Sequence, residues 1–77
     1  MQAHELKSLL ATAFQGEVEV ASPDDVHFQA RIVDDIFDGL PTLVRHRMVY
    51  AVLGERMGGE VHALSLRTQT PAEAERA

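Results

Sequence analysis

Apolar residues change their spacing abruptly at Gly16. Upstream of this glycine, Leu6, Leu10 and Phe14 stand four residues apart, which places them on one face of a helix. Downstream, apolar and polar residues alternate over residues 17–21 and again over residues 27–33, as they do in strands with one buried face. A chain that combines both spacings is predicted to form an α+β domain, with a helix over residues 3–14 packed on a sheet.

A short polar segment joins the two predicted strands. Its sequence, Ser-Pro-Asp-Asp at residues 22–25, is typical of a turn, so we expect the strands to form an antiparallel hairpin. Asp38, Gly39 and Pro41 indicate a second turn, which one short helical turn over residues 35–37 precedes.

The second half of the chain is predicted to contain a long helix and one more strand. The helix covers residues 42–57 and ends at the glycine pair 58–59. The strand covers residues 60–68, so His62 falls near its start. A last short helix is predicted to begin with Thr70 as N-cap and Glu73 three residues later, which is a capping box.

These elements form one domain over residues 1–77, without an internal repeat or a linker. A domain of this size has a thin hydrophobic core. On the long helix, Val44, Met48, Ala51 and Val52 are predicted to form one buried stripe. The full set of predicted core residues is Leu9, Leu10, Phe14, Val18, Val20, Phe28, Ile32, Val44, Met48, Val52 and Leu64.

Composition restricts the function further. The chain has no cysteine, so it supplies neither a disulfide nor a thiolate ligand. Its 12 acidic residues outnumber its 7 lysines and arginines, and the formal charge of −5 disfavours binding to nucleic acid. The N-terminus does not resemble a signal peptide, and no apolar run approaches the ~20 residues of a membrane span. We therefore expect a cytoplasmic protein that does not bind membranes.

Several motifs resemble those of the BolA family. They are His27-Phe28, Phe37-Asp38-Gly39-Leu40, Arg45-His46-Arg47 with Tyr50, His62-Ala63-Leu64-Ser65, and Thr70-Pro71 with Glu73. The resemblance spans nearly the whole chain. The short turn at residues 22–25 is similar to the short-loop, IbaG-like branch, whereas the triplet at 45–47 is closer to BolA proper. Ala74 departs from the pattern, because the family usually has tryptophan there.

This resemblance implies a class II KH-like fold in the order α-β-β-(α)-α-β-(α), and a function that is not enzymatic. It implies that the chain pairs with a monothiol glutaredoxin and shares a [2Fe–2S] cluster with it, in iron–sulfur cluster trafficking or iron-status regulation. Glutaredoxin and glutathione would provide the thiolates, and the isolated chain is expected to bind no cofactor tightly. The residue that matches the cluster-side histidine of the family is His62.

Histidine suits such a role, because two imidazoles replace two thiolates on one iron in some clusters. The alternative for His62 is a partly buried structural histidine, and the resemblance favours the ligand. His27 is the best candidate for a second ligand, with a plain surface role as an equal alternative. Asp24 and Asp25 are weaker oxygen donors.

Binding to DNA, as a transcriptional regulator of stress or morphology, is the alternative function. Its phosphate contacts would come from Arg31, Arg45, Arg47 and Arg67. The segment that corresponds to the Gly-x-x-Gly loop of KH domains starts at Gly39 and lacks its second glycine. Arg45, His46, Arg47 and Arg67 are also the candidates for a partner surface. Whether the chain forms a homodimer stays open.

Overall fold

The structure, a computed structural model, describes residues 1–76. Its elements are α1 (Ala3–Ala13), β1 (Glu17–Ala21), β2 (His27–Val33), the 3₁₀ helix η1 (Asp35–Phe37), α2 (Thr42–Leu53), the 3₁₀ helix η2 (Gly54–Arg56), β3 (Ala63–Gln69) and α3 (Pro71–Arg76). The predicted order is confirmed, with η2 as one additional short element.

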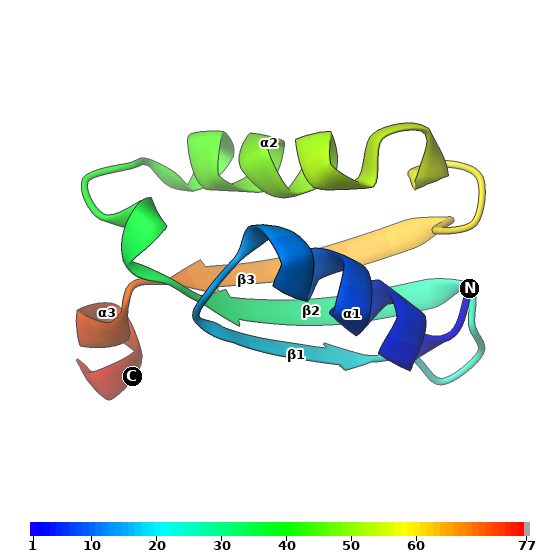
Figure 1. Ribbon diagram of the computed structural model, residues 1–77, viewed down its shortest axis with the longest axis horizontal. Helices are drawn as coiled ribbons and strands as arrows, with labels where there is room; N and C mark the ends of the chain where they lie inside the picture. The colour runs from blue at the N-terminus through cyan, green and yellow to red at the C-terminus, as the bar shows by residue number, and fades with distance from the viewer. Residues whose placement is uncertain (77) are drawn as a thin grey trace.

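Within the described residues, three strands form one sheet in the order β1-β2-β3. β1 and β2 are antiparallel, which confirms the predicted hairpin. β3 runs parallel to β2, and the register pairs His27 with Ala63 at one end and Val33 with Gln69 at the other. A parallel pair needs a long crossover, and α2 lies within it. Figure 1 shows that α1 and α2 lie on the same side of the sheet, which leaves the other face open.

The core lies between the sheet and these two helices. The predicted core residues that are buried are Leu10, Phe14, Val18, Phe28 and Ile32. Those that are half-buried and pack around them are Leu9, Val20, Met48, Val52 and Leu64. The core also contains Leu6, Ala30, Phe37, Val49, Leu53 and Val61. The rings of Phe14 and Phe37 lie 5.6 Å apart, so η1 closes the core next to the end of α1.

The prediction for the buried face of α2 was correct only in part, because Met48 and Val52 pack half-buried against the core but Ala51 is exposed. Val44 is exposed, and Arg45, Val49 and Leu53 are the buried residues of this helix. They stand four apart and share one face. The stripe is difficult to recognise in the sequence because its first residue is an arginine. In the structure, the guanidinium of Arg45 lies over the ring of Phe37, 5.8 Å from its centre.

Two predicted boundaries also need correction. α2 ends at Leu53, four residues before residue 57, because Gly54 adopts a φ of +56° that ends the helix. β3 begins at Ala63, so His62 lies directly before this strand and not within it. In the part of the chain that is described, no helix is long and apolar enough to cross a membrane.

Candidate metal centre

The first residues of β2 and β3 lie at the same end of the sheet, because the two strands are parallel. The N–H of Ala63 donates a hydrogen bond to the carbonyl of Val26 at 3.2 Å, and Ala63 is the register partner of His27. His62 precedes Ala63 and therefore lies beside the start of β2. We call the end of the sheet that carries His27 and His62 the histidine rim. It faces right in Figure 1.

His27 is held in place by the loop that precedes it. Its ring atom Nδ1 lies 2.8 Å from Oδ2 of Asp24, and Oδ1 of Asp24 accepts hydrogen bonds from the backbone N–H groups of Val26 and His27. The backbone and ring of His27, followed by the backbone of Val26, lower the pKa of the Asp24 carboxyl to about 2. The carboxylate thus orients the imidazole, whose side chain remains 65% exposed.

His62 is positioned by its backbone neighbours. Val61 before it is fully buried, and its N–H donates to the carbonyl of Arg56 at 2.9 Å. Ala63 after it is paired with β2. Both flanking residues are therefore fixed, while the imidazole of His62 is exposed.

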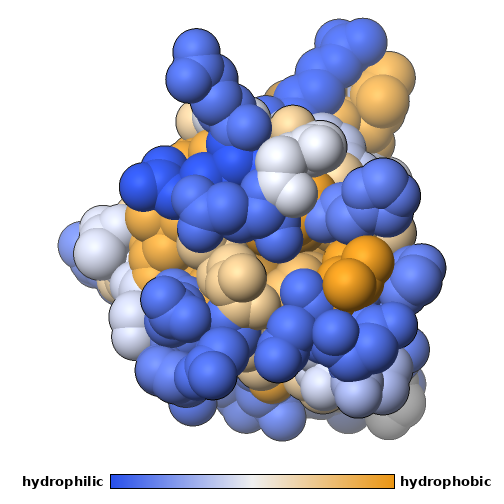
Figure 2. All heavy atoms as spheres, turned by 90° about the vertical axis from the view of Figure 1, so that its right-hand side faces the viewer, coloured by the Kyte–Doolittle hydropathy of each residue, from blue (hydrophilic) through white to orange (hydrophobic). Residues whose placement is uncertain are grey.

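The histidine rim is open to solvent. Figure 2 looks at this end of the molecule and shows a mainly hydrophilic surface with small apolar areas between the polar side chains. The loop between β1 and β2 and the segment between η2 and β3 both end here. A second molecule can therefore approach both histidines from outside the sheet.

The two rim histidines fit half of an iron–sulfur ligand set. Within residues 1–76, no three His, Cys, Asp or Glu side chains converge to hold a metal ion. A [2Fe–2S] cluster takes four ligands, and two of them can be imidazoles on one iron. His27, the first residue of β2, and His62, the residue before β3, are of the type that such a pair would need, and the remaining ligands would have to come from another molecule.

Arg45 is not part of the surface to which the sequence analysis assigned it. It is buried, and its guanidinium donates hydrogen bonds to the carbonyls of Leu40 and Thr68 and to both carboxylate oxygens of Glu73. Glu73 raises the pKa of the Arg45 guanidinium, and Arg45 lowers the pKa of the Glu73 carboxyl to about 2. Arg45 therefore fastens α3 to α2 and to the end of β3.

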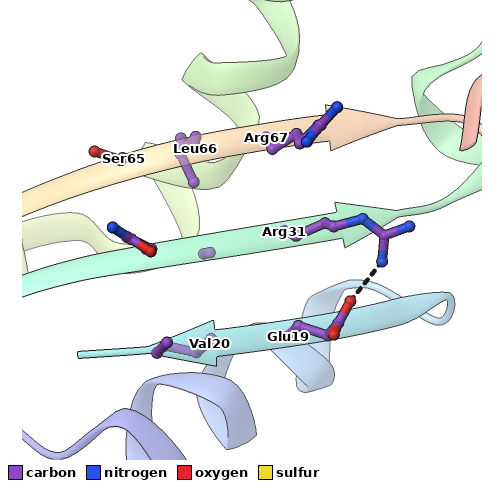
Figure 3. A pocket seen from close by; sticks show the side chains of 9 residues that line it. Glu19, Val20, Arg31, Ser65, Leu66 and Arg67 are labelled. Atoms are coloured by element: carbon purple, nitrogen blue, oxygen red, sulfur yellow. Dashed lines mark hydrogen bonds and ion pairs between the residues drawn. The ribbon is translucent and has the colours of Figure 1, made fainter. Parts of the chain in front are cut away.

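The other positively charged candidates differ in their availability. Arg31 lies on the open face of the sheet and pairs with Glu19 (Figure 3) and with Glu17, both from β1, so its charge is already balanced within the sheet. Arg67 and Arg47 are exposed, and His46 is half-buried. Two of the four arginines expected to contact phosphate are thus bound within the chain, which weakens the DNA alternative.

The contact of Asp24 with His27 was not predicted from the sequence, where Asp24 was a possible oxygen ligand. Both oxygens of this carboxylate are engaged by residues 26 and 27, so Asp24 holds the backbone and the ring of His27. The signal was present: an aspartate three residues before a histidine, in a turn sequence, often bonds to the backbone that follows it. The role of Arg45 also had a signal, its spacing of four from Val49.

The fold and the site together define a class of protein. A three-stranded sheet with α1 and α2 on one face, in this element order, is a class II KH-like α+β domain, and here it carries two exposed histidines at one rim. A family model described as BolA-like protein matches residues 10–73. The chain therefore belongs to the BolA family.

Individual relatives agree with this assignment. The chain is 47% identical to human BolA-like protein 1 over 49 residues, which are 64% of this chain and 36% of that protein. It is 34% identical to the acid stress protein IbaG of Escherichia coli, over 95% of this chain and 88% of IbaG. The chain thus matches little more than a third of the length of the human protein but nearly all of IbaG.

Solved structures show the same fold. A BolA protein homologue from Coxiella burnetii superimposes with a TM-score of 0.81 at 41% identity, over 99% of both chains. The BolA domain of SufE1 from Arabidopsis thaliana gives a TM-score of 0.80 at 34% identity, over 92% of this chain and 93% of that one.

Proposed function

We propose that this chain is a non-enzymatic partner of a monothiol glutaredoxin. In this proposal the two proteins share a [2Fe–2S] cluster, to which this chain contributes His62 and His27. The complex takes part in iron–sulfur cluster trafficking or in signalling iron status. Membership of the BolA family supports the choice of partner and cluster.

The observation that carries the proposal is the parallel register of β2 and β3. It brings two exposed histidines to one end of two adjacent strands, in a chain without cysteine. A thiolate partner and a histidine partner are complementary, because each supplies the ligands that the other lacks. The exposed rim leaves room for the second protein.

Histidine ligation would give the complex two measurable properties. Imidazole is neutral where thiolate is anionic, so the cluster should have a higher reduction potential than one held by four thiolates. A protonated imidazole has no free electron pair for iron. The complex should therefore lose its cluster in mild acid more readily than an all-thiolate complex does.

The test is to reconstitute the complex from the purified chain, a monothiol glutaredoxin, glutathione, iron and sulfide. The mixed complex should show visible absorption and circular dichroism that differ from those of glutaredoxin alone. His62→Ala should change these spectra or abolish the complex, and His27→Ala should have the same kind of effect to a smaller extent. His4→Ala is the matched control, because it removes an exposed imidazole from α1 and leaves both strands unchanged.

One result would refute the proposal. If His62→Ala forms the mixed complex with unaltered spectra and unaltered stability in acid, His62 does not bind the cluster. Far-UV circular dichroism of each variant checks that the fold is intact.

A further inference from the structure

The two rim histidines are held very differently. His27 has a carboxylate partner for its ring, whereas no hydrogen bond to the ring of His62 is formed by the described residues. The hydrogen bonds of the loop between β1 and β2 converge on His27. The difference between the two histidines is therefore the contact of Asp24 with the ring of His27.

The loop is rigid where it meets β2. Ser22 donates its hydroxyl to the carbonyl of His27 at 2.6 Å and accepts the N–H of Asp25 at 3.0 Å. Asp24 accepts the N–H groups of Val26 and His27 at 3.0 and 2.8 Å. The backbone before His27 is thereby fixed on both sides of the turn, so the carboxylate and the ring keep their relative positions.

The contact between the carboxylate and the ring determines the tautomer. An ionised carboxylate only accepts hydrogen bonds, so the Nδ1 atom 2.8 Å away has to carry the proton. In a neutral imidazole the other nitrogen, Nε2, then keeps its free electron pair. Metal-binding histidines in proteins commonly have this arrangement, in which a carboxylate holds the nitrogen that does not bind the metal.

We infer that Asp24 is a positioning residue, which fixes His27 as the Nδ1–H tautomer and presents Nε2 to a metal that a partner brings to the histidine rim. The metal part of this inference rests on the proposed function, whereas the tautomer part does not.

Asp24→Asn is the decisive variant. The amide keeps one oxygen for the two backbone N–H groups, but its nitrogen donates to Nδ1 and moves the ring proton to Nε2. The same exchange in hydrolase triads preserves the geometry and yields the wrong tautomer. Asp25→Asn is the matched control: it removes the same charge one residue away, where φ is +59°, a conformation that asparagine tolerates well.

The first measurement uses the chain alone, labelled with ¹⁵N, at about pH 9 where a free imidazole is neutral. Long-range ¹H–¹⁵N correlation spectra should show protonated Nδ1 and unprotonated Nε2 for His27, in the wild type and in Asp25→Asn. Asp24→Asn should reverse this pattern. A wild-type His27 with the proton on Nε2, or a tautomer that Asp24→Asn leaves unchanged, would overturn the inference.

The second measurement uses the reconstituted complex with glutaredoxin and a chelator that competes for iron. Asp24→Asn should lower cluster affinity by roughly 10- to 100-fold, the usual range for a group that orients a ligand, and Asp25→Asn by less than about twofold. If His27→Ala weakens the complex and Asp24→Asn does not, the positioning role is refuted and the proposed function stands. If neither His27→Ala nor His62→Ala changes the complex, the proposed function fails, and the metal role of Asp24 fails with it.

Discussion

Gly16 lies at the end of the sheet opposite the histidine rim, and its replacement by alanine should destabilise the fold severely. A Cβ atom at this position would lie 1.8 Å from the carbonyl oxygen of Val33 and 2.9 Å from its carbonyl carbon. Contacts below 3.0 Å are essentially never made by real Cβ atoms. The chain would therefore have to move by more than 1 Å at this point.

Neither side of this contact can move without breaking hydrogen bonds. Val33 belongs to the central strand and is paired with both Glu17 and Gln69. The N–H of Gly16 donates to Oδ2 of Asp34 at 3.1 Å. Overpacking costs typically about 1–3 kcal/mol, and the lost hydrogen bonds raise the expected destabilisation to about 2–4 kcal/mol. For a domain of this size that corresponds to a fall in the melting temperature of roughly 10–25 °C.

Gly59→Ala is the matched control, because its Cβ would meet the carbonyl oxygen of Glu55 at an ordinary 3.4 Å. This variant should melt within a few degrees of the wild type, since the change in unfolded-state entropy is worth only about 0.4–1 kcal/mol. Thermal melts followed by far-UV circular dichroism measure both variants. If Gly16→Ala melts within about 3 °C of Gly59→Ala, the backbone at residue 16 has room for a Cβ atom beside Val33 and the predicted clash is refuted.

Three further predictions concern the buried arginine, acid stability and DNA. Arg45→Met should lower the free energy of unfolding by about 1.5–3 kcal/mol, because it removes donors to Leu40, Thr68 and Glu73, and urea denaturation tests this. Glu73 has a lowered pKa in the folded state, so its contribution to stability is complete above about 4.5 and is lost as the pH falls towards about 2. The stability difference between the wild type and Glu73→Gln should accordingly shrink over this interval, and a constant difference would contradict the ion pair. Fluorescence anisotropy should detect no sequence-specific DNA binding tighter than roughly 10⁻⁸ M, the weak end of the specific range.

The strands were predictable because their side chains alternate within a few residues. Val18, Phe28 and Ile32 are buried and Glu19 is exposed, as local alternation indicates. The predicted start of β3 at residue 60 was too early, since apolar residues continue upstream to Val61 although the strand begins at Ala63. That residue is buried through contacts with the turn after α2, and not through pairing within a strand of the sheet.

The buried face of α2 could not be read from its hydrophobic pattern. Arg45 is charged, and burial of a charge requires partners from elsewhere in the chain. Those partners include the carbonyl of Thr68 and the carboxylate of Glu73, which lie 23 and 28 residues further along. The spacing of apolar residues around Val44 predicted a buried face that was correct only in part, because local spacing contains no information about these distant partners of Arg45.

For the candidate site, the sequence by itself determined the kind of ligand. A chain without cysteine has no thiolate, so imidazole is the nitrogen donor that it can offer to iron, and the motifs around His27 and His62 already indicated which histidines to consider. Only the tertiary structure decided that they lie together. Their proximity depends on the parallel pairing of β2 with β3, which joins residues 36 apart in the chain. Local spacing cannot specify such a pairing, because it is set by how the crossover through α2 packs on the sheet.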